Sequence, residues 1–229
     1  MHKTINPKPM SKRILFIVFV SLLGFAVESD AQSRLYPTNR FIRVYSDEDF
    51  VVMSDKYLLG DIEDAAFAFT ITPSWGDDSS CRYSIANSTF ILNVAEENIW
   101  HYYLSSNSEN NSEELPGVNI VEYRCKIPWE TAKYFRELFS AAANSSSYLA
   151  RPFGLDGVTY EIISFKNGWV TAGFWSPKKD TNCYALEQIL KQITVAVKEN
   201  NRSAIEALVP AALELTATFK ELYPADVVE

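Results

Sequence analysis

The first half of the chain is a series of short runs rich in β-branched and aromatic residues, separated by polar or acidic turns. Apolar runs of this length, or runs in which apolar and polar positions alternate, are typical of β-strands. The predicted strands of this region are 41–45, 65–72, 81–85, 89–94 and 98–104. Pro73 ends the second of them, because proline cannot donate a backbone hydrogen bond to a neighbouring strand. The segment 46–64 fits either extended chain or a short helix.

In the second half of the chain, apolar residues also recur at the longer spacing that is typical of a helix. Residues 118–127 still alternate and predict a strand, but 128–143 carry apolar residues at the spacing of one helix face. Pro128 suits the first turn of that helix, where a missing N–H costs nothing.

A hairpin and two further helices are predicted beyond this point. The β-rich runs 158–165 and 169–175 flank Asn167-Gly168, a strong hairpin signal. Asp180 or Thr181 is expected to cap the helix that follows.

The last helix has its own start signal and an internal break. Ser203 and Glu206 have the spacing of a capping box, and Pro210 lies inside the helical pattern, where it should kink or split the helix.

These elements predict an α+β fold, an antiparallel β-sheet with two or three α-helices packed on one face. In the C-terminal half the predicted order of elements is a β-strand, a helix, a β-hairpin and two further helices (β-helix-hairpin-helix-helix). We expect one domain over 40–229, with a mobile polar loop at 105–117 and a flexible leader at 32–39.

Residues 1–31 have the pattern of a secretory signal peptide. Four basic residues precede the apolar run 14–27, and Ser29 and Ala31 occupy the small-residue positions of a cleavage site after Ala31. The run of 14 residues is shorter than the roughly 20 that cross a bilayer. We therefore expect an exported protein, periplasmic or extracellular, that is not an integral membrane protein after cleavage; an uncleaved signal anchor is the alternative.

One part of the chain combines an Asp-Gly-x-x-Tyr strand start, a strand that exits through Trp-Ser-Pro, and a Leu-rich helix. The positions that carry this pattern are Asp156, Gly157, Tyr160, Trp175, Ser176, Pro177, Cys183 and Leu186. In this pattern the chain resembles small exported bacterial, lipoprotein-like proteins of unassigned function. The resemblance brings no activity, and it implies that Trp175 packs under the helix that follows.

The net charge of the chain limits the classes of partner that we expect it to bind. The whole chain carries −8, and cleavage after Ala31 removes four basic and two acidic residues, which leaves −10. An acidic surface repels phosphate backbones, so nucleic acid is not an expected partner.

Few residues are suited to catalysis or metal binding. His101 is the only histidine after the predicted cleavage site, and no Gly-x-Ser-x-Gly is present to supply a nucleophile elbow. The acidic segments, among them 75–80, lack the spacing of a calcium loop, and the cysteines lack the spacing of a zinc site. We predict no metal and no cofactor. For His101 we favour the role of a surface residue in a strand over that of a catalytic residue.

The three cysteines, Cys81, Cys125 and Cys183, each lie on an apolar face. One disulfide among them and three buried thiols fit the sequence equally well.

Aromatic residues are the remaining candidates for a binding site. In a regular strand Trp169 and Trp175 share one face, and with Tyr160 and His101 they form the tentative ligand-binding set. A role in the core is the competing interpretation for these aromatics.

We therefore expect an exported cell-envelope protein and favour a non-catalytic binding domain over an enzyme, with a protein or glycan as partner. The alternatives are a carboxylate-dependent hydrolase that acts on glycans, and an immunity or inhibitor protein.

Overall fold

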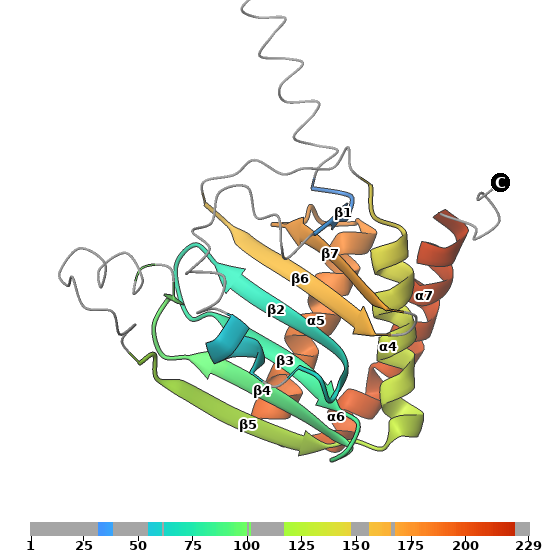
Figure 1. Cartoon of the computed structure of the whole chain (residues 1–229). Coiled ribbons are helices and arrows are strands. Elements are labelled where there is room, and N and C mark those ends of the chain that lie inside the picture. Colours follow the sequence, from blue (N-terminus) through green and yellow to red (C-terminus); the bar gives the residue numbers. More distant parts are fainter. Residues whose placement is uncertain are drawn as a thin grey trace, which may run out of the picture.

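The computed structural model describes residues 32–38, 55–60, 62–99, 101, 117–147, 156–165 and 168–222. A seven-stranded antiparallel sheet has the order β1-β7-β6-β2-β3-β4-β5 (Figure 1). Its strands are β1 (Tyr36–Pro37), β2 (Ala65–Pro73), β3 (Ser79–Ser84), β4 (Thr89–Ala95), β5 (Ile120–Lys126), β6 (Val158–Phe165) and β7 (Trp169–Trp175). The helices whose bounds lie within the described residues are the π-helical turn η1 (Asp55–Leu59) and the α-helices α4 (Trp129–Asn144), α5 (Asn182–Lys198), α6 (Arg202–Ala207) and α7 (Val209–Leu222). The predicted α+β class is confirmed.

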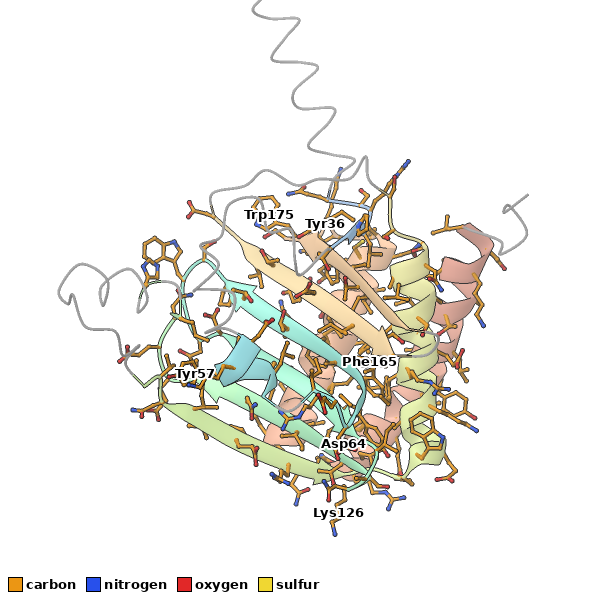
Figure 2. All side chains as sticks on the ribbon, in the orientation of Figure 1. Tyr36, Tyr57, Asp64, Lys126, Phe165 and Trp175 are labelled. Carbon is orange, nitrogen blue, oxygen red and sulfur yellow. The ribbon has the colours of Figure 1, made fainter. Side chains whose placement is uncertain are left out.

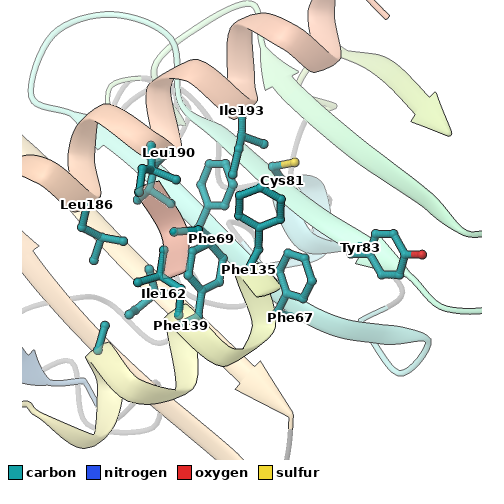
Figure 3. Close-up of a cluster of buried hydrophobic side chains, with 14 of the residues drawn as sticks. Phe67, Phe69, Cys81, Tyr83, Phe135, Phe139, Ile162, Leu186, Leu190 and Ile193 are labelled. Atoms are coloured by element: carbon teal, nitrogen blue, oxygen red, sulfur yellow. The ribbon is translucent and has the colours of Figure 1, made fainter. Parts of the chain in front are cut away.

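The main core lies between the sheet and the α-helices. Alternate residues of β2 point toward the helices, so Phe67 and Phe69 meet Phe139 of α4 edge to face, with ring centroids 5.3 and 6.0 Å apart. Figure 3 shows how β2, β3 and β6 on one side and α4 and α5 on the other supply this cluster. Burying each such side chain contributes about 1.5–3 kcal/mol, so this interface is the main source of stability.

The opposite face of the sheet carries a row of buried polar residues and is covered in part by η1. Glu161, Thr70, Ser80 and Asn93 lie side by side across β6, β2, β3 and β4. The Ser80 hydroxyl and the Asn93 amide both donate to the Leu58 carbonyl, the latter at 2.7 Å. Those two hydrogen bonds attach η1 to the sheet.

Residues 32–38 belong to the domain, although we expected a flexible leader at 32–39. Tyr36–Pro37 forms the edge strand β1 and pairs with β7, and Leu35 is 2 % exposed within the main core. A stretch this short, with a proline in its strand, has no periodicity that would reveal its pairing.

The predicted strand 98–104 is wrong for the part that the structure describes. Ile99 and His101 have helical backbone. Two side chains hold this helical start, because Asn98 accepts from the His101 N–H at 3.1 Å and Asp78 accepts from the Ile99 N–H at 2.8 Å. The competing preference of the aromatic residues for a strand is thereby overridden.

The predicted capping box at Ser203 is also wrong. Asn201 caps α6, since its side chain accepts from the Ala204 N–H at 3.1 Å, and Glu206 pairs with Arg202 instead. Pro210 lies in the first turn of α7, and the helical pattern is split between α6 and α7 at Leu208.

The predicted strand 41–45 and residues 105–116 of the predicted loop lie outside the described residues. Of the segment 46–64, residues 55–59 are helical as η1.

Candidate functional site

The most exposed large apolar side chain in the described part of the chain is Trp75, with 73 % of its surface accessible. It lies on the connection between β2 and β3. The His101 ring stacks on the Trp75 indole with centroids 4.9 Å apart and planes 25° apart. The Trp75 indole Nε1–H donates to Asp156 Oδ1 at 3.3 Å. We call Trp75, His101 and Asp156 the Trp75 corner.

Three segments that are far apart in sequence meet at this corner. Ser74 and Gly157 are joined twice, because the Ser74 N–H donates to the Gly157 carbonyl at 2.7 Å and the Gly157 N–H donates to the Ser74 hydroxyl at 3.0 Å. The Asn98 amide donates to the carbonyls of Pro73 and Gly76, at 3.0 and 3.3 Å. The exposed indole is therefore held on a hydrogen-bonded base, which lowers the entropy lost when a ligand binds.

Asp78 lies behind the corner and is 1 % exposed. Its Oδ2 accepts from the Ile99 N–H at 2.8 Å, and its Oδ1 has no hydrogen-bond partner among the residues that the structure describes. Burial, and secondarily the neighbouring Asp77 carboxylate, raise the pKa of Asp78 to about 6, against the lowering effects of the Ile99 bond and of His101. This carboxylate therefore titrates near neutral pH beside His101.

Trp175 is half-buried and lies at the end of the sheet where β1 pairs with β7 (Figure 2). Since Phe174 points into the helix-facing core, Trp175 points to the opposite face of the sheet. A Cβ atom at Gly157 would lie 2.6 Å from Trp175 Nε1, so the indole packs over the Gly157 backbone. The resemblance implied that Trp175 packs under the following helix, and this is wrong. Neighbouring residues of a strand point to opposite faces, and Phe174 is the one that faces the helices.

Tyr160 is fully buried on the helix side of the sheet, where no surface ligand reaches it. Its ring stacks on Phe174 with centroids 4.8 Å apart, and its hydroxyl donates to Glu187 of α5. Glu187 also pairs with Lys191 at 2.8 Å. Burial and the Glu187 carboxylate raise the pKa of Tyr160, so this hydroxyl stays protonated. Tyr160 therefore anchors α5 to β6.

Of the tentative ligand-binding set, His101 alone belongs to the Trp75 corner. Trp175 adjoins it through Gly157, and the side chain of Trp169 lies outside the described residues. The sequence analysis missed Trp75. The available signal was a tryptophan in the turn Ser-Trp-Gly-Asp-Asp, where a large apolar residue has no strand or helix face to pack on.

Cys81, Cys125 and Cys183 are buried free thiols. Desolvation raises the pKa of the Cys81 thiol and raises that of Cys183 to about 12, so both are protonated and unreactive at neutral pH.

Within the described ranges, no three His, Cys, Asp or Glu side chains are grouped closely enough to hold a metal ion. Among the same residues, no helix combines the length and the apolar character that a membrane crossing requires.

Comparison with known proteins adds no relative: no family model, no curated protein and no solved structure matches this chain.

Proposed function

We propose that this protein is an exported, non-catalytic binding domain of the bacterial cell envelope, and that it binds a protein or a glycan at the Trp75 corner. The observation that carries the proposal is the 73 % exposure of Trp75 on a hydrogen-bonded base. A large rigid aromatic side chain in water costs free energy, and aromatic anchors of this kind dominate the energetics of many interfaces.

Export is supported by the N-terminal sequence. A basic start, an apolar run over 14–27 and small residues at Ser29 and Ala31 make cleavage after Ala31 the expected processing. Mass spectrometry of the protein recovered from bacteria that express the full chain should find Gln32 as the first residue. Recovery of the uncleaved chain in the membrane fraction would favour the signal anchor.

The binding proposal is tested by a screen with three proteins. The wild type, Trp75→Ala and Ile85→Ala are immobilised and exposed to a glycan array and to solubilised envelope proteins. Ile85 is the matched control, because it is 55 % exposed but lies at the other end of β3. We expect a partner that is retained by the wild type and Ile85→Ala and lost by Trp75→Ala.

No partner of either kind, or a partner that Trp75→Ala retains fully, would contradict the proposal. Circular dichroism of the three proteins checks that each is folded.

A carboxylate-dependent hydrolase is the second candidate, and Asp78 favours it. A buried carboxyl whose pKa is raised to about 6 has the property of a general acid. The role requires that substrate reach a side chain that is 1 % exposed, which makes it the weaker candidate. It predicts hydrolysis of a glycan by the wild type and loss of that hydrolysis in Asp78→Asn.

A further inference from the structure

We infer that the group bound at the Trp75 corner is a cation, the guanidinium or ammonium group of an arginine or lysine in a basic segment of a partner protein. This inference rests on the proposed function and narrows the class of partner. It combines the open indole face with the charge of the surface around it.

The Trp75 indole has one ring face for a ligand. His101 covers the other face, yet 73 % of the Trp75 side chain is accessible, so the second face is open to water. The face of an indole is the best aromatic partner for a cation, because the ring quadrupole places negative potential there. At an exposed site such a contact contributes a factor of about two to five in affinity.

Two exposed carboxylates lie at this corner or in the same turn, and neither has a counter-ion among the described residues. Asp156 lies at the indole edge, and Asp77 follows Trp75 by two residues in the same turn. Both side chains are exposed, and neither forms an ion pair within the described part of the chain. A cation placed on the indole would therefore gain attraction from two carboxylates that have no ion-pair partner among the described residues.

A second acidic segment lies next to the first. The Ala95 N–H donates to the Asp78 carbonyl at 2.8 Å, and Asn98 binds the Gly76 carbonyl, so the turn that holds Glu96 and Glu97 packs beside this loop. Glu96 and Glu97 are exposed and, among the residues that the structure describes, form no ion pair. The Asp78 carboxylate adds further negative charge behind His101.

The surface charge favours a basic protein segment over a glycan. A neutral sugar ring would pack on the indole equally well, but it would leave these carboxylates without a counter-ion. The whole chain, at −8, attracts a basic partner over longer range as well. An extended segment with several Arg or Lys residues would engage both acidic turns at once.

The test is a nuclear magnetic resonance titration of the ¹⁵N-labelled protein. The probes are an acetylated peptide of four Gly-Arg repeats, its twin with citrulline in place of arginine, and chitotetraose. Citrulline keeps the length and planar end group of arginine, replaces one donor nitrogen with an acceptor oxygen, and removes the charge. The readout is the Trp75 indole N–H signal, which is assigned by its loss in Trp75→Phe.

We expect the arginine peptide to shift this signal and the citrulline twin to bind at least about tenfold more weakly. Trp75→Ala should weaken the arginine peptide about fivefold and Asp156→Asn about threefold, while Ile85→Ala should leave its affinity unchanged.

Equal binding of the two peptides, or full binding by Trp75→Ala, would overturn the inference. A shift with chitotetraose and none with either peptide would overturn it but leave the proposed binding function in place. No shift with any probe would also overturn it, and the proposed function would then depend on the three-protein screen alone.

Discussion

At the scale of single residues, Asp78 links stability to pH. Its pKa is about 6 in the folded protein against 3.8 for an ordinary aspartate, because burial disfavours the charged form. The folded state therefore holds this proton more tightly than the unfolded state. The stabilising contribution is fully present below about pH 4 and is lost as the pH rises through about 6.

Replacing Asp78 by Asn removes this titration. The free energy of unfolding of Asp78→Asn minus that of the wild type should increase by up to about 3 kcal/mol between about pH 4 and pH 7, because only the wild type loses stability over this range. Urea denaturation of both proteins at the two pH values measures the change, because contributions from the other carboxyls cancel in the difference. Glu214→Gln, which removes an exposed carboxylate of α7 that is remote in sequence from Asp78, is the control. A difference that stays constant with pH would contradict the account of Asp78.

The Tyr160 hydroxyl is a second residue with a measurable structural role. Tyr160→Phe removes a buried donor to Glu187, and loss of a hydrogen bond to a charged group costs about 1.5–3 kcal/mol. Urea denaturation should show this loss. Tyr123 is a half-buried tyrosine of β5 and serves as the control. Tyr123→Phe should change the free energy of unfolding by less than about 0.5 kcal/mol. Equal effects of the two substitutions would show that the Tyr160–Glu187 bond does not stabilise the fold.

At the scale of elements, the helix caps make a discriminating prediction. Asn201→Ala should destabilise the protein by about 1 kcal/mol, because the Ala204 N–H at the start of α6 loses its acceptor. Ser203→Ala lies inside α6, where alanine is a good helix former, and should cost far less. Thermal unfolding of both variants measures the difference. A larger loss of stability in Ser203→Ala than in Asn201→Ala would contradict this assignment and favour the capping box that the sequence suggests.

Elements with a strong local pattern could be predicted from the sequence. Strand β2 ends at Pro73 as expected, and the apolar stripe of α4 is the buried one, with Phe135, Leu138 and Phe139 among its core residues. The failures depended on distant contacts. The helical start at Ile99 depends on the Asp78 carboxylate, which accepts from the Ile99 N–H. Asp78 is 21 residues away in sequence, so the local pattern around Ile99 does not reveal this contact.

The candidate site was harder to predict than the fold. Aromatic content pointed to a binding surface, but alternation alone does not say which aromatic side chains another layer covers. Tyr160 is under α5, whereas Trp75 is exposed because it lies in a turn beyond the end of β2. His101 was identified, yet its partner Trp75 lies in the acidic segment 75–80, which the sequence analysis considered only as a calcium loop.

At the scale of the whole molecule, the fold separates stability from the proposed function. The aromatic core and the α-helices occupy one side of the sheet, and the Trp75 corner is built from turns where strands begin and end (Figure 1). Changes at the corner should therefore alter binding with little effect on unfolding, which makes mutational tests of the site interpretable.

The central claim is that a partner contacts the Trp75 corner, and photocrosslinking in cells tests it most directly. Benzoylphenylalanine is placed at Asp77, an exposed position of the same turn, or at Ala86, an exposed position at the other end of β3, in bacteria that express the full chain. The account predicts a crosslinked adduct from position 77 and none from position 86. Adducts from position 86 alone, or from neither position, would contradict it.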